Sequence, residues 1–306
     1  MTVSTPAGAP APLRILLSDH ARAQYGERIA SVMGDRPFTF VAPAPGADVD
    51  VGWVTREVTG KSTKHEVQPE TQRFYDTLTG APSLRWVQLH SAGADRPVFV
   101  DLLARGKTIT SASGANADVV AQTVLCGLLA LARHFPLLWD AQREHKWAPL
   151  IQSGMPRDIA GQTAVIVGWG PIGQQVAGVL RLLGMKVAAV RSSAAPAAPD
   201  IETVAFEDIG TLLPAGARLL NVSRGEVVDE AALVEALRAG RLAGAYLDVF
   251  THEPLAADSP LWDLPNVIAT PHTAGHSDGH AARVAEIFLD NLGRFNAGQK
   301  MVNQVG

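Results

Sequence analysis

Three polar side chains in the second half of the chain could together bind an acid and transfer a proton. Arg224 follows the apolar run LLNVS, Glu253 follows AYLDVF, and His272 follows VIAT. A guanidinium binds a carboxylate through paired hydrogen bonds, an imidazole gives or takes a proton near neutral pH, and a neighbouring carboxylate stabilises the imidazolium. Because parallel strands end at one edge of a sheet, we expect the three side chains to converge there.

A glycine-rich segment upstream predicts a dinucleotide site. The stretch AVIVGWGPIGQQVAGVLRLLGMKVAAVR has the pattern of a buried strand, a turn, an amphipathic helix and a second strand. Gly168, Gly170 and Gly173 have G-x-G-x-x-G spacing, which allows a tight turn, a close approach of backbone to pyrophosphate, and packing of helix on strand. The helix predicted from Ile172 would point its N-terminus at the phosphates. A glycine turn that serves packing alone is the weaker alternative.

The end of the second strand of this motif favours NADP(H) over NAD(H). An NAD site usually has Asp or Glu there, about 20 residues after the glycines. Here Val190 is followed by Arg191, Ser192 and Ser193, and the nearest acid is Asp200. A guanidinium with hydroxyls suits a 2′-phosphate. The alternative is a solvated surface arginine.

The three polar clusters behind the nucleotide motif supply what hydride reduction of a 2-oxo acid needs. A cation must hold the carboxylate and polarise the ketone, and an acid must protonate the developing alkoxide. Taken singly, Arg224 could be a surface residue, Glu253 before Pro254 could shape a turn, and His272 after Pro271 could cap a strand. Together, behind a dinucleotide motif, the catalytic interpretation is favoured.

At these residues the chain resembles the D-isomer-specific 2-hydroxyacid dehydrogenase family. The resemblance is carried by NVSRGEVVDE, LDVFTHEP and TPHTAG, and by VQLHSAGADR in the first half. The Arg191–Ser192 pair is most similar to the NADPH-dependent glyoxylate/hydroxypyruvate reductase branch, and the glutamate partner of the histidine differs from the related formate dehydrogenases. The resemblance implies an oxidoreductase that transfers a hydride between NADP(H) and a small 2-oxo or 2-hydroxy acid, with glyoxylate or hydroxypyruvate favoured.

The resemblance also implies a role for each site residue. Arg224 binds substrate, Glu253 and His272 form the acid–base pair, and Asp248 meets the nicotinamide carboxamide. A turn in the first half offers backbone N–H groups to the substrate carboxylate; its residues are Ser91, Ala92 and Gly93. Further cofactor contacts are expected beside the glycines and the catalytic residues, from Pro171, Ile172, Val222, Ser223 and Gly275.

A second function class stays open. The same fold serves in transcriptional corepressors of the C-terminal-binding-protein type, which this chain also resembles, so a nucleotide-sensing or inactive binding protein is the alternative. The net charge of −4 and the pI near 6.1 give no reason to expect nucleic acid or an anionic membrane as partner.

Composition predicts a soluble protein of the reducing cytoplasm. No apolar stretch reaches membrane-spanning length without polar interruption, and the start MTVSTPAGAPAP has the character of a disordered tail rather than a signal peptide. Cys126 is the one cysteine, and its apolar surroundings predict buried packing rather than a nucleophile. His272, His276 and His280 are spaced by four, but without a supporting carboxylate or cysteine cluster we expect no metal.

The alternation of strands and helices predicts an α/β protein with two domains. Residues 1–112 and 276–306 should form a smaller flavodoxin-like substrate domain, and residues 113–275 a Rossmann-type doubly wound parallel sheet. An apolar helix from Asn116 past Leu131, bent or ended by Pro136, is predicted to join the Trp139–Trp147 stretch in a homodimer contact. Covering the protein's own core is the alternative. Trp53 and His90 lie at strand ends, where packing is favoured over substrate contact.

The segment between Asp208 and Arg224 is too short. FEDIGTLLPAGARLLNVSRG passes directly from a helix start to the arginine strand, so one crossover unit of about 25–30 residues is missing from the middle of the expected sheet. Three explanations are open. The printed sequence omits residues, ARLLNVS moves into the place of the lost strand, or the cofactor fold is incomplete and inactive.

Overall fold

The computed structural model describes residues 11–62, 66–151 and 154–305. The predicted N-terminal tail therefore lies, up to residue 10, outside the described residues. The chain divides into two compact units: unit 1 is Met1–Ala115 with Asp278–Gly306, and unit 2 is Asn116–Ser277.

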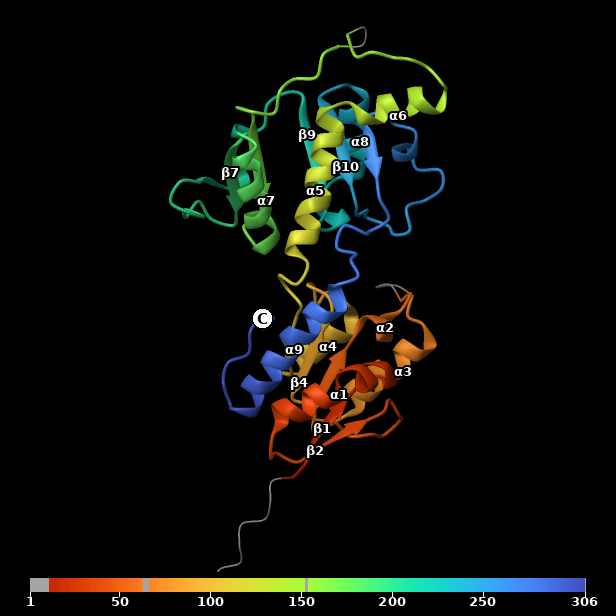
Figure 1. The fold of residues 1–306 in the computed structure, drawn as a ribbon, viewed down its shortest axis with the longest axis vertical. Coiled ribbons are helices and arrows are strands. Elements are labelled where there is room, and N and C mark those ends of the chain that lie inside the picture. The colour runs from red at the N-terminus through yellow and green to blue at the C-terminus, as the bar shows by residue number, and fades with distance from the viewer. Residues whose placement is uncertain (1–10, 63–65, 152–153, 306) are drawn as a thin grey trace, which may run out of the picture. The chain divides into compact units, whose positions relative to one another are not determined.

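Unit 1 is built on a sheet of five parallel strands in the order β2-β1-β3-β4-β5 (Figure 1). The strands are β1 Leu13–Leu16, β2 Phe38–Val41, β3 Val51–Val54, β4 Trp86–Leu89 and β5 Thr108–Thr110. This strand order is that of flavodoxin-like sheets, which confirms the predicted fold class for this unit. All positions of β3 and β4 are buried, as expected for parallel strands covered on both faces.

Helices cover both faces of the unit 1 sheet. On one face lie α1 Asp19–Met33 and α9 His280–Asn296, and on the other α3 Pro69–Gly80 and α4 Pro97–Ala104. Neighbouring strand residues point to opposite faces, so Ile15 packs against the first pair of helices and Leu16 against the second. The short helix α2 is Arg56–Thr59. The α1 helix begins where Ser18 Oγ accepts a hydrogen bond from Ala21 N at 3.0 Å.

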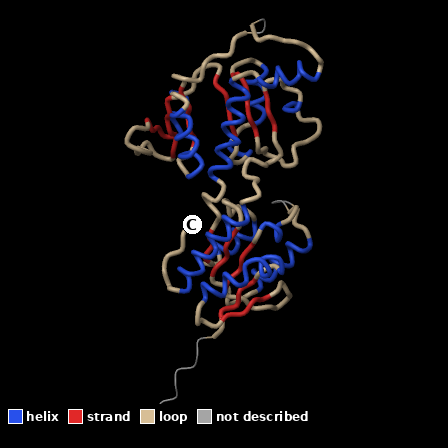
Figure 2. The backbone as a smooth tube through the Cα atoms, in the orientation of Figure 1, coloured by secondary structure: helices blue, strands red, loops and turns tan. Residues whose placement is uncertain are grey.

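Unit 2 contains two separate parallel sheets of three strands (Figure 2). The first has the order β6-β7-β8 and consists of Thr163–Val167, Lys186–Arg191 and Glu202–Ala205. The second has the order β11-β10-β9 and consists of β9 Ala217–Asn221, β10 Leu242–Leu247 and β11 Val267–Ala269. The helix α5, Ala117–Ala132, packs against α7 (Pro171–Leu182) beside the first sheet and against β9 and β10 of the second. The remaining helical segments are α6 Phe135–Arg143, α8 Glu230–Arg238, and the 3₁₀ turns η1 Phe206–Thr211, η2 Gly225–Val227 and η3 Pro260–Trp262.

The missing crossover unit leaves β6 and β9 as edge strands. In a single doubly wound sheet the lost strand would lie beside β6; here β6 pairs with β7 and β9 pairs with β10. The structure therefore contradicts the explanation that ARLLNVS moves into the vacant place. It retains the α/β class and the strand–glycine turn–helix of a Rossmann unit, but in two half-sheets instead of the single sheet predicted.

The long apolar helix ends before the proline. The α5 helix stops at Ala132, His134 adopts a left-handed φ of 59°, and Pro136 lies in the first turn of α6. Proline is tolerated there because first-turn N–H groups have no partner within the helix. Among the described residues, no single helix is long and apolar enough to cross a membrane. The pair α5 and α6 reaches that length and apolar composition only when the two are taken together, and it is bent by 72°.

The prediction that Cys126 is buried is wrong, because this side chain is exposed. The buried stripe of α5 includes Val120, Val124, Leu128 and Leu131, spaced by three and four residues. Cys126 is two residues from Val124, so it points about 200° away around the helix. An apolar run alone does not show which face of a helix meets the core.

Candidate active site

The three predicted catalytic side chains follow three neighbouring strands. Arg224 follows β9, Glu253 follows β10 and His272 follows β11, and these strands are adjacent and parallel. All three therefore start from the carboxyl edge of one sheet, where ligands bind in open parallel sheets.

The structure brings Glu253 and His272 into direct contact. His272 Nδ1 lies 2.8 Å from Glu253 Oε2, and Phe250 N donates to the other carboxylate oxygen at 3.1 Å. A carboxylate only accepts hydrogen bonds, so Nδ1 carries the proton and Nε2 is left for a reacting atom. The imidazole is 51% exposed, which leaves that edge accessible.

The loop that carries His272 is folded over Asp248. The backbone at His272 is left-handed, with φ 52°, and its N–H donates to the carbonyl of Asp248 at 2.8 Å. The Asp248 side chain is 1% exposed. Its Oδ1 accepts from Thr270 Oγ1 and Thr273 N, and its Oδ2 accepts from Ala274 N. Asp248 thus fixes the position of the histidine loop in the structure.

The loop that carries Arg224 is fixed against the glutamate loop. Asn221 Nδ2 donates to the carbonyl of Arg224 at 2.8 Å, and Asn221 Oδ1 accepts from the N–H and hydroxyl of Ser223. A Cβ on Gly225 would lie 1.9 Å from the carbonyl carbon of Phe250. Only glycine permits this approach, which holds the arginine loop against the segment that leads to Glu253.

The sequence interpretation missed three residues that support this site. Tyr246 Oη lies 2.8 Å from Thr270 Oγ1, and the single proton of Thr270 goes to Asp248, so Tyr246 is the donor to Thr270. Asn221 orders the arginine loop as described above. The three residues, Asn221, Tyr246 and Thr270, are polar and lie at or beside the carboxyl end of an apolar strand. This position in the sequence is the signal that could have identified them as site residues.

The glycine turn has the geometry that a pyrophosphate requires. Gly168 has a φ of 89°, and a Cβ on Gly173 would lie 2.4 Å from the Gly168 carbonyl oxygen. A Cβ on Gly170 would meet no atom within 4 Å, so the backbone there is open to a ligand. The α7 helix begins at Pro171 without a side-chain cap, so the N–H of Ile172 at its N-terminus is available to an anion. These residues fit a dinucleotide.

Arg191 is the last residue of β7, half-buried, with exposed Ser192 and Ser193 after it. The nearest acid in sequence, Asp200, pairs instead with Arg181 of α7 at 3.2 Å. The charge at this strand end is therefore the one that suits a 2′-phosphate. Of the other predicted cofactor contacts, Val222 and Ser223 directly follow β9, and Gly275 accepts a hydrogen bond from Asn116 Nδ2 at 2.7 Å.

The predicted substrate turn lies in unit 1, after β4. Ser91 Oγ donates to the Gly93 carbonyl at 2.7 Å, and the Ser91 carbonyl accepts from Ala112 N at 2.8 Å. The turn is thus anchored at its first residue, and the exposed Ala92 lies at its tip.

The histidines spaced by four do not form one face of a helix. His276 N donates to the Thr273 carbonyl in a turn of unit 2, whereas His280 begins α9 in unit 1. Across residues 11–62, 66–151 and 154–305, no group of three or more His, Cys, Asp or Glu could hold a metal ion.

Comparison with known proteins agrees with this geometry. The NAD-binding domain of the D-isomer specific 2-hydroxyacid dehydrogenases matches the chain over residues 125–215 and 194–274. The two stretches overlap at residues 194–215, where the crossover unit is missing.

Two curated relatives have similar lengths. A glyoxylate reductase from Korarchaeum cryptofilum (strain OPF8) is 32% identical over 75% of this chain and 79% of its own length. A glycerate dehydrogenase from Methylorubrum extorquens is 31% identical over 73% of this chain and 80% of its own length. The chain also spans about half the length of a D-3-phosphoglycerate dehydrogenase from Archaeoglobus fulgidus, which is 27% identical.

Two solved structures share the fold over 96% of this chain. A D-isomer specific 2-hydroxyacid dehydrogenase family protein from Aeromonas salmonicida aligns with a TM-score of 0.73 and 28% identity, covering 96% of this chain and 99% of that one. A D-isomer specific 2-hydroxyacid dehydrogenase from Xanthobacter autotrophicus Py2, in complex with NADPH and MES, aligns with a TM-score of 0.71 and 26% identity, covering 96% of this chain and 98% of that one.

Proposed function

The chain belongs to the D-isomer-specific 2-hydroxyacid dehydrogenase family, and on that premise we propose that it reduces glyoxylate or hydroxypyruvate with NADPH. The observation that carries the proposal is the 2.8 Å contact between His272 and Glu253, at the sheet edge from which Arg224 also starts. This pairing gives a proton donor whose side chain is 51% exposed.

The proposed roles follow from the chemistry of each side chain. When bound, the cofactor supplies a hydride to the ketone carbon. Arg224 holds the substrate carboxylate and polarises the ketone through its planar guanidinium. His272 gives a proton from Nε2 to the oxygen that becomes the alcohol, while Glu253 stabilises the imidazolium. The Ser91–Gly93 turn adds backbone N–H groups for the carboxylate.

The proposed cofactor site uses the glycine turn for the pyrophosphate and Arg191 with Ser192 for the 2′-phosphate. Support comes from the open backbone at Gly170 and from the pairing of Asp200 with Arg181. Ile172, Val222, Ser223 and Gly275 would complete the contacts. Asp248 would meet the carboxamide through a lone pair that the histidine loop leaves unused, since each carboxylate oxygen has two.

The cofactor proposal is tested by reversing one charge. Arg191→Asp should lower kcat/KM for NADPH and raise it for NADH, because a carboxylate repels the 2′-phosphate and accepts from ribose hydroxyls. Arg238→Asp, at an exposed position of α8 in the same unit, is the control. An unchanged NADPH/NADH ratio in Arg191→Asp would mean that another group binds the phosphate.

The substrate proposal rests on the names of two relatives, a glyoxylate reductase and a glycerate dehydrogenase. NADPH oxidation by the full chain should be measured with glyoxylate, hydroxypyruvate, pyruvate and 3-phosphohydroxypyruvate. Turnover of the first two above the others supports the proposal. NADPH binding with no turnover of any of the four would favour a nucleotide-sensing protein of the same fold instead.

We also propose that the protein forms a homodimer through α5 and α6. Exposed apolar side chains gather on α6 and the segment after it: Phe135, Leu137, Trp139, Trp147 and Ile151. Such a surface is typical of a protein interface. Light scattering with gel filtration should give a molar mass of twice the chain mass. In Trp139→Glu the molar mass should fall to that of a single chain.

A further inference from the structure

A small pocket lies within unit 1, at the carboxyl ends of β1, β3 and β4. It contains a cavity of about 30 Å³, which is enough for a water-sized group. Six of its lining residues matter here: Tyr25, Trp53, Thr55, Glu57, His90 and His280. His90 immediately precedes the Ser91–Gly93 turn.

Two buried donors in this lining have no partner among the described residues. They are the hydroxyl of Tyr25 and Nε1 of Trp53, on side chains that are 7% and 1% exposed. The two rings are 5.3 Å apart, and Trp53 also stacks on Phe288 at 4.2 Å, so neither ring turns easily toward another partner. Buried polar groups in native proteins are nearly always hydrogen-bonded, so these two indicate that the cavity receives an acceptor oxygen.

A carboxylate on the rim supplies the opposite hydrogen-bonding character. Glu57 Oε1 accepts from Ser18 Oγ at 2.6 Å and from Thr55 Oγ1 at 2.5 Å. These two hydroxyls hold the carboxylate in place and leave Oε2 without a partner among the described residues. A group that enters here should therefore donate a hydrogen bond and carry no negative charge.

The histidine in the lining is neutral. Thr59 gives its single hydroxyl proton to the Arg56 carbonyl, so His90 Nε2, 2.9 Å away, is the donor to Thr59 Oγ1. Burial, with the charges of His280 and two arginines, lowers the pKa of His90 to about 3. The Arg56 guanidinium in the lining is on the exposed rim beside Glu57.

A hydroxyl is the group that both accepts from two donors and donates to a carboxylate. We propose that this pocket binds the terminal hydroxyl of a 3-hydroxy-2-oxo acid and so selects hydroxypyruvate over 2-oxo acids that lack the hydroxyl or carry a phosphate. The inference rests on the proposed function, because the Ser91–Gly93 turn beside His90 would hold the carboxylate of the same molecule.

The test compares two substrates that differ by one hydroxyl. With NADPH and the full chain, kcat/KM is measured for hydroxypyruvate and for pyruvate. Tyr25→Phe and Trp53→Phe each remove one donor and should lower the hydroxypyruvate/pyruvate ratio about 3- to 10-fold, the range of one neutral hydrogen bond. The fall in the ratio should come from a lower kcat/KM for hydroxypyruvate, while kcat/KM for pyruvate changes little.

Matched controls come from the same unit. Trp86→Phe removes an indole N–H that already donates to Thr110 at 2.7 Å, and Tyr75→Phe removes a hydroxyl that accepts from Arg96. Both should leave the substrate ratio unchanged. An unchanged ratio in both Tyr25→Phe and Trp53→Phe would overturn the proposal, as would an equal fall in the controls.

A binding measurement separates this proposal from the proposed function. Calorimetry of the full chain with NADP⁺ gives the Kd of D-glycerate and of D-lactate without turnover. A preference for D-glycerate that Tyr25→Phe and Trp53→Phe both reduce supports the pocket even if no 2-oxo acid is reduced. Equal affinities for the two acids in the unaltered chain would overturn it. Thermal unfolding of each variant shows whether the fold is retained.

Discussion

Both units contain apolar parallel strands, but the strands differ in how deeply their side chains are buried. In unit 1, VGWV of β3 lies between two neighbours and is buried at each position. In unit 2, TAVIV of β6 is as apolar at its centre, yet none of its residues is buried and Val167 is 59% exposed. The difference comes from the missing neighbour, not from the strand itself. The burial of a parallel strand depends on what its sheet supplies on both sides.

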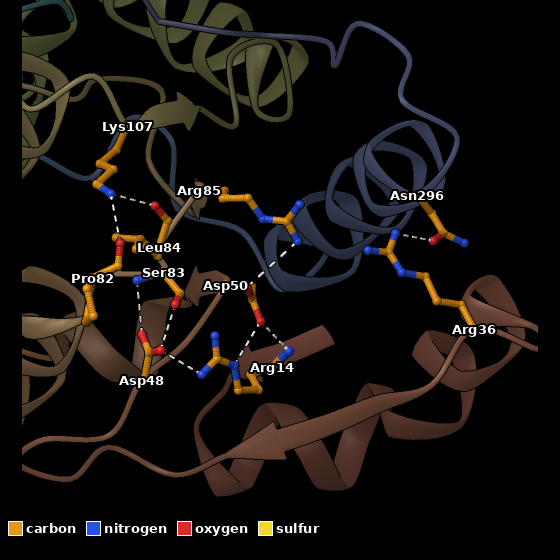
Figure 3. A network of polar contacts seen from close by, with 10 residues as sticks. All are labelled: Arg14, Arg36, Asp48, Asp50, Pro82, Ser83, Leu84, Arg85, Lys107 and Asn296. Carbon is orange, nitrogen blue, oxygen red and sulfur yellow. Dashed lines mark hydrogen bonds and ion pairs between the residues drawn. The ribbon is translucent and has the colours of Figure 1, made fainter. Parts of the chain in front are cut away.

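Charged residues show the same contrast. In unit 1, Arg14 of β1 pairs with Asp50 at 3.0 Å and Asp48 at 2.7 Å (Figure 3). Hydrogen bonds from Ser83 and Arg14 lower the pKa of Asp48 to about 2. In unit 2, partial burial lowers the pKa of Arg218 in β9, and the charge of Arg157 lowers it further. Arg14 of unit 1 is thus paired with two carboxylates, whereas Arg218 of unit 2 is partly desolvated near a second positive charge.

The largest effect should come from removing the proposed acid without disturbing either unit. His272→Ala should lower kcat by about 10²–10⁴ with Kd for NADPH retained, because the exposed imidazole contributes chemistry rather than packing. Steady-state kinetics and cofactor titration measure both quantities. Equal losses of kcat and of cofactor binding would show instead that the half-sheet carrying the site depends on this residue.

Hydrogen exchange measures the contrast between the sheets directly. Amides of β3 and β4 should exchange about 10³-fold more slowly than those of β6, since an edge strand with half-buried side chains opens locally at little cost. Mass spectrometry of peptides from each strand gives the rates. Similar protection in β3 and β6 would mean that the open edge of β6 is covered in solution.

The same isoleucine-to-alanine substitution should lower the free energy of unfolding more in unit 1 than in unit 2. Ile15→Ala in β1, where the side chain is fully buried, should cost about 2–5 kcal/mol of unfolding free energy. Ile166→Ala in β6, half-buried, should cost about 1–2 kcal/mol, because less surface is lost from the core. Urea unfolding followed by fluorescence provides both values, and equal costs would contradict the comparison.

A pH dependence of the free energy of unfolding is expected from unit 1. The folded pKa of His90, about 3, is below the unfolded value near 6.5. Above pH 6.5 its contribution to stability is complete, and it is lost as pH falls from 6.5 toward 3, because only the unfolded state then takes up the proton. His90→Gln should reduce the loss between pH 7 and 5 by about 2 kcal/mol. His20→Gln, at an exposed position, is the control.

The sequence predicted most of the elements, because their signals are local. Asp229, an acid directly before an apolar helical stripe, caps α8 by accepting from Ala232 N at 3.0 Å. The strand, turn, helix and second strand predicted for the glycine-rich segment are β6, the glycine turn, α7 and β7. The contact between Glu253 and His272 follows from strand ends that share one edge, a rule that needs no knowledge of tertiary packing.

What could not be predicted depends on contacts between distant residues. The exposed face of α5 at Cys126 is set by which side meets the strands, and the separation of β6 from β9 is set by a segment that the chain lacks. The approach of Gly225 to Phe250 depends on register between two loops. The pairing of Tyr25 and Trp53 in one cavity joins a helix to a strand, which no spacing along the chain reveals.

The three donors that converge on Asp248 make this position intolerant of its nearest isostere. An asparagine has the same shape, but its amide nitrogen would face either the Ala274 N–H or the donors on the other side. Either orientation sets two hydrogens against each other in a space closed to water. Replacing one oxygen by nitrogen leaves the volume of the side chain almost unchanged. It would still be enough to release the loop that carries His272.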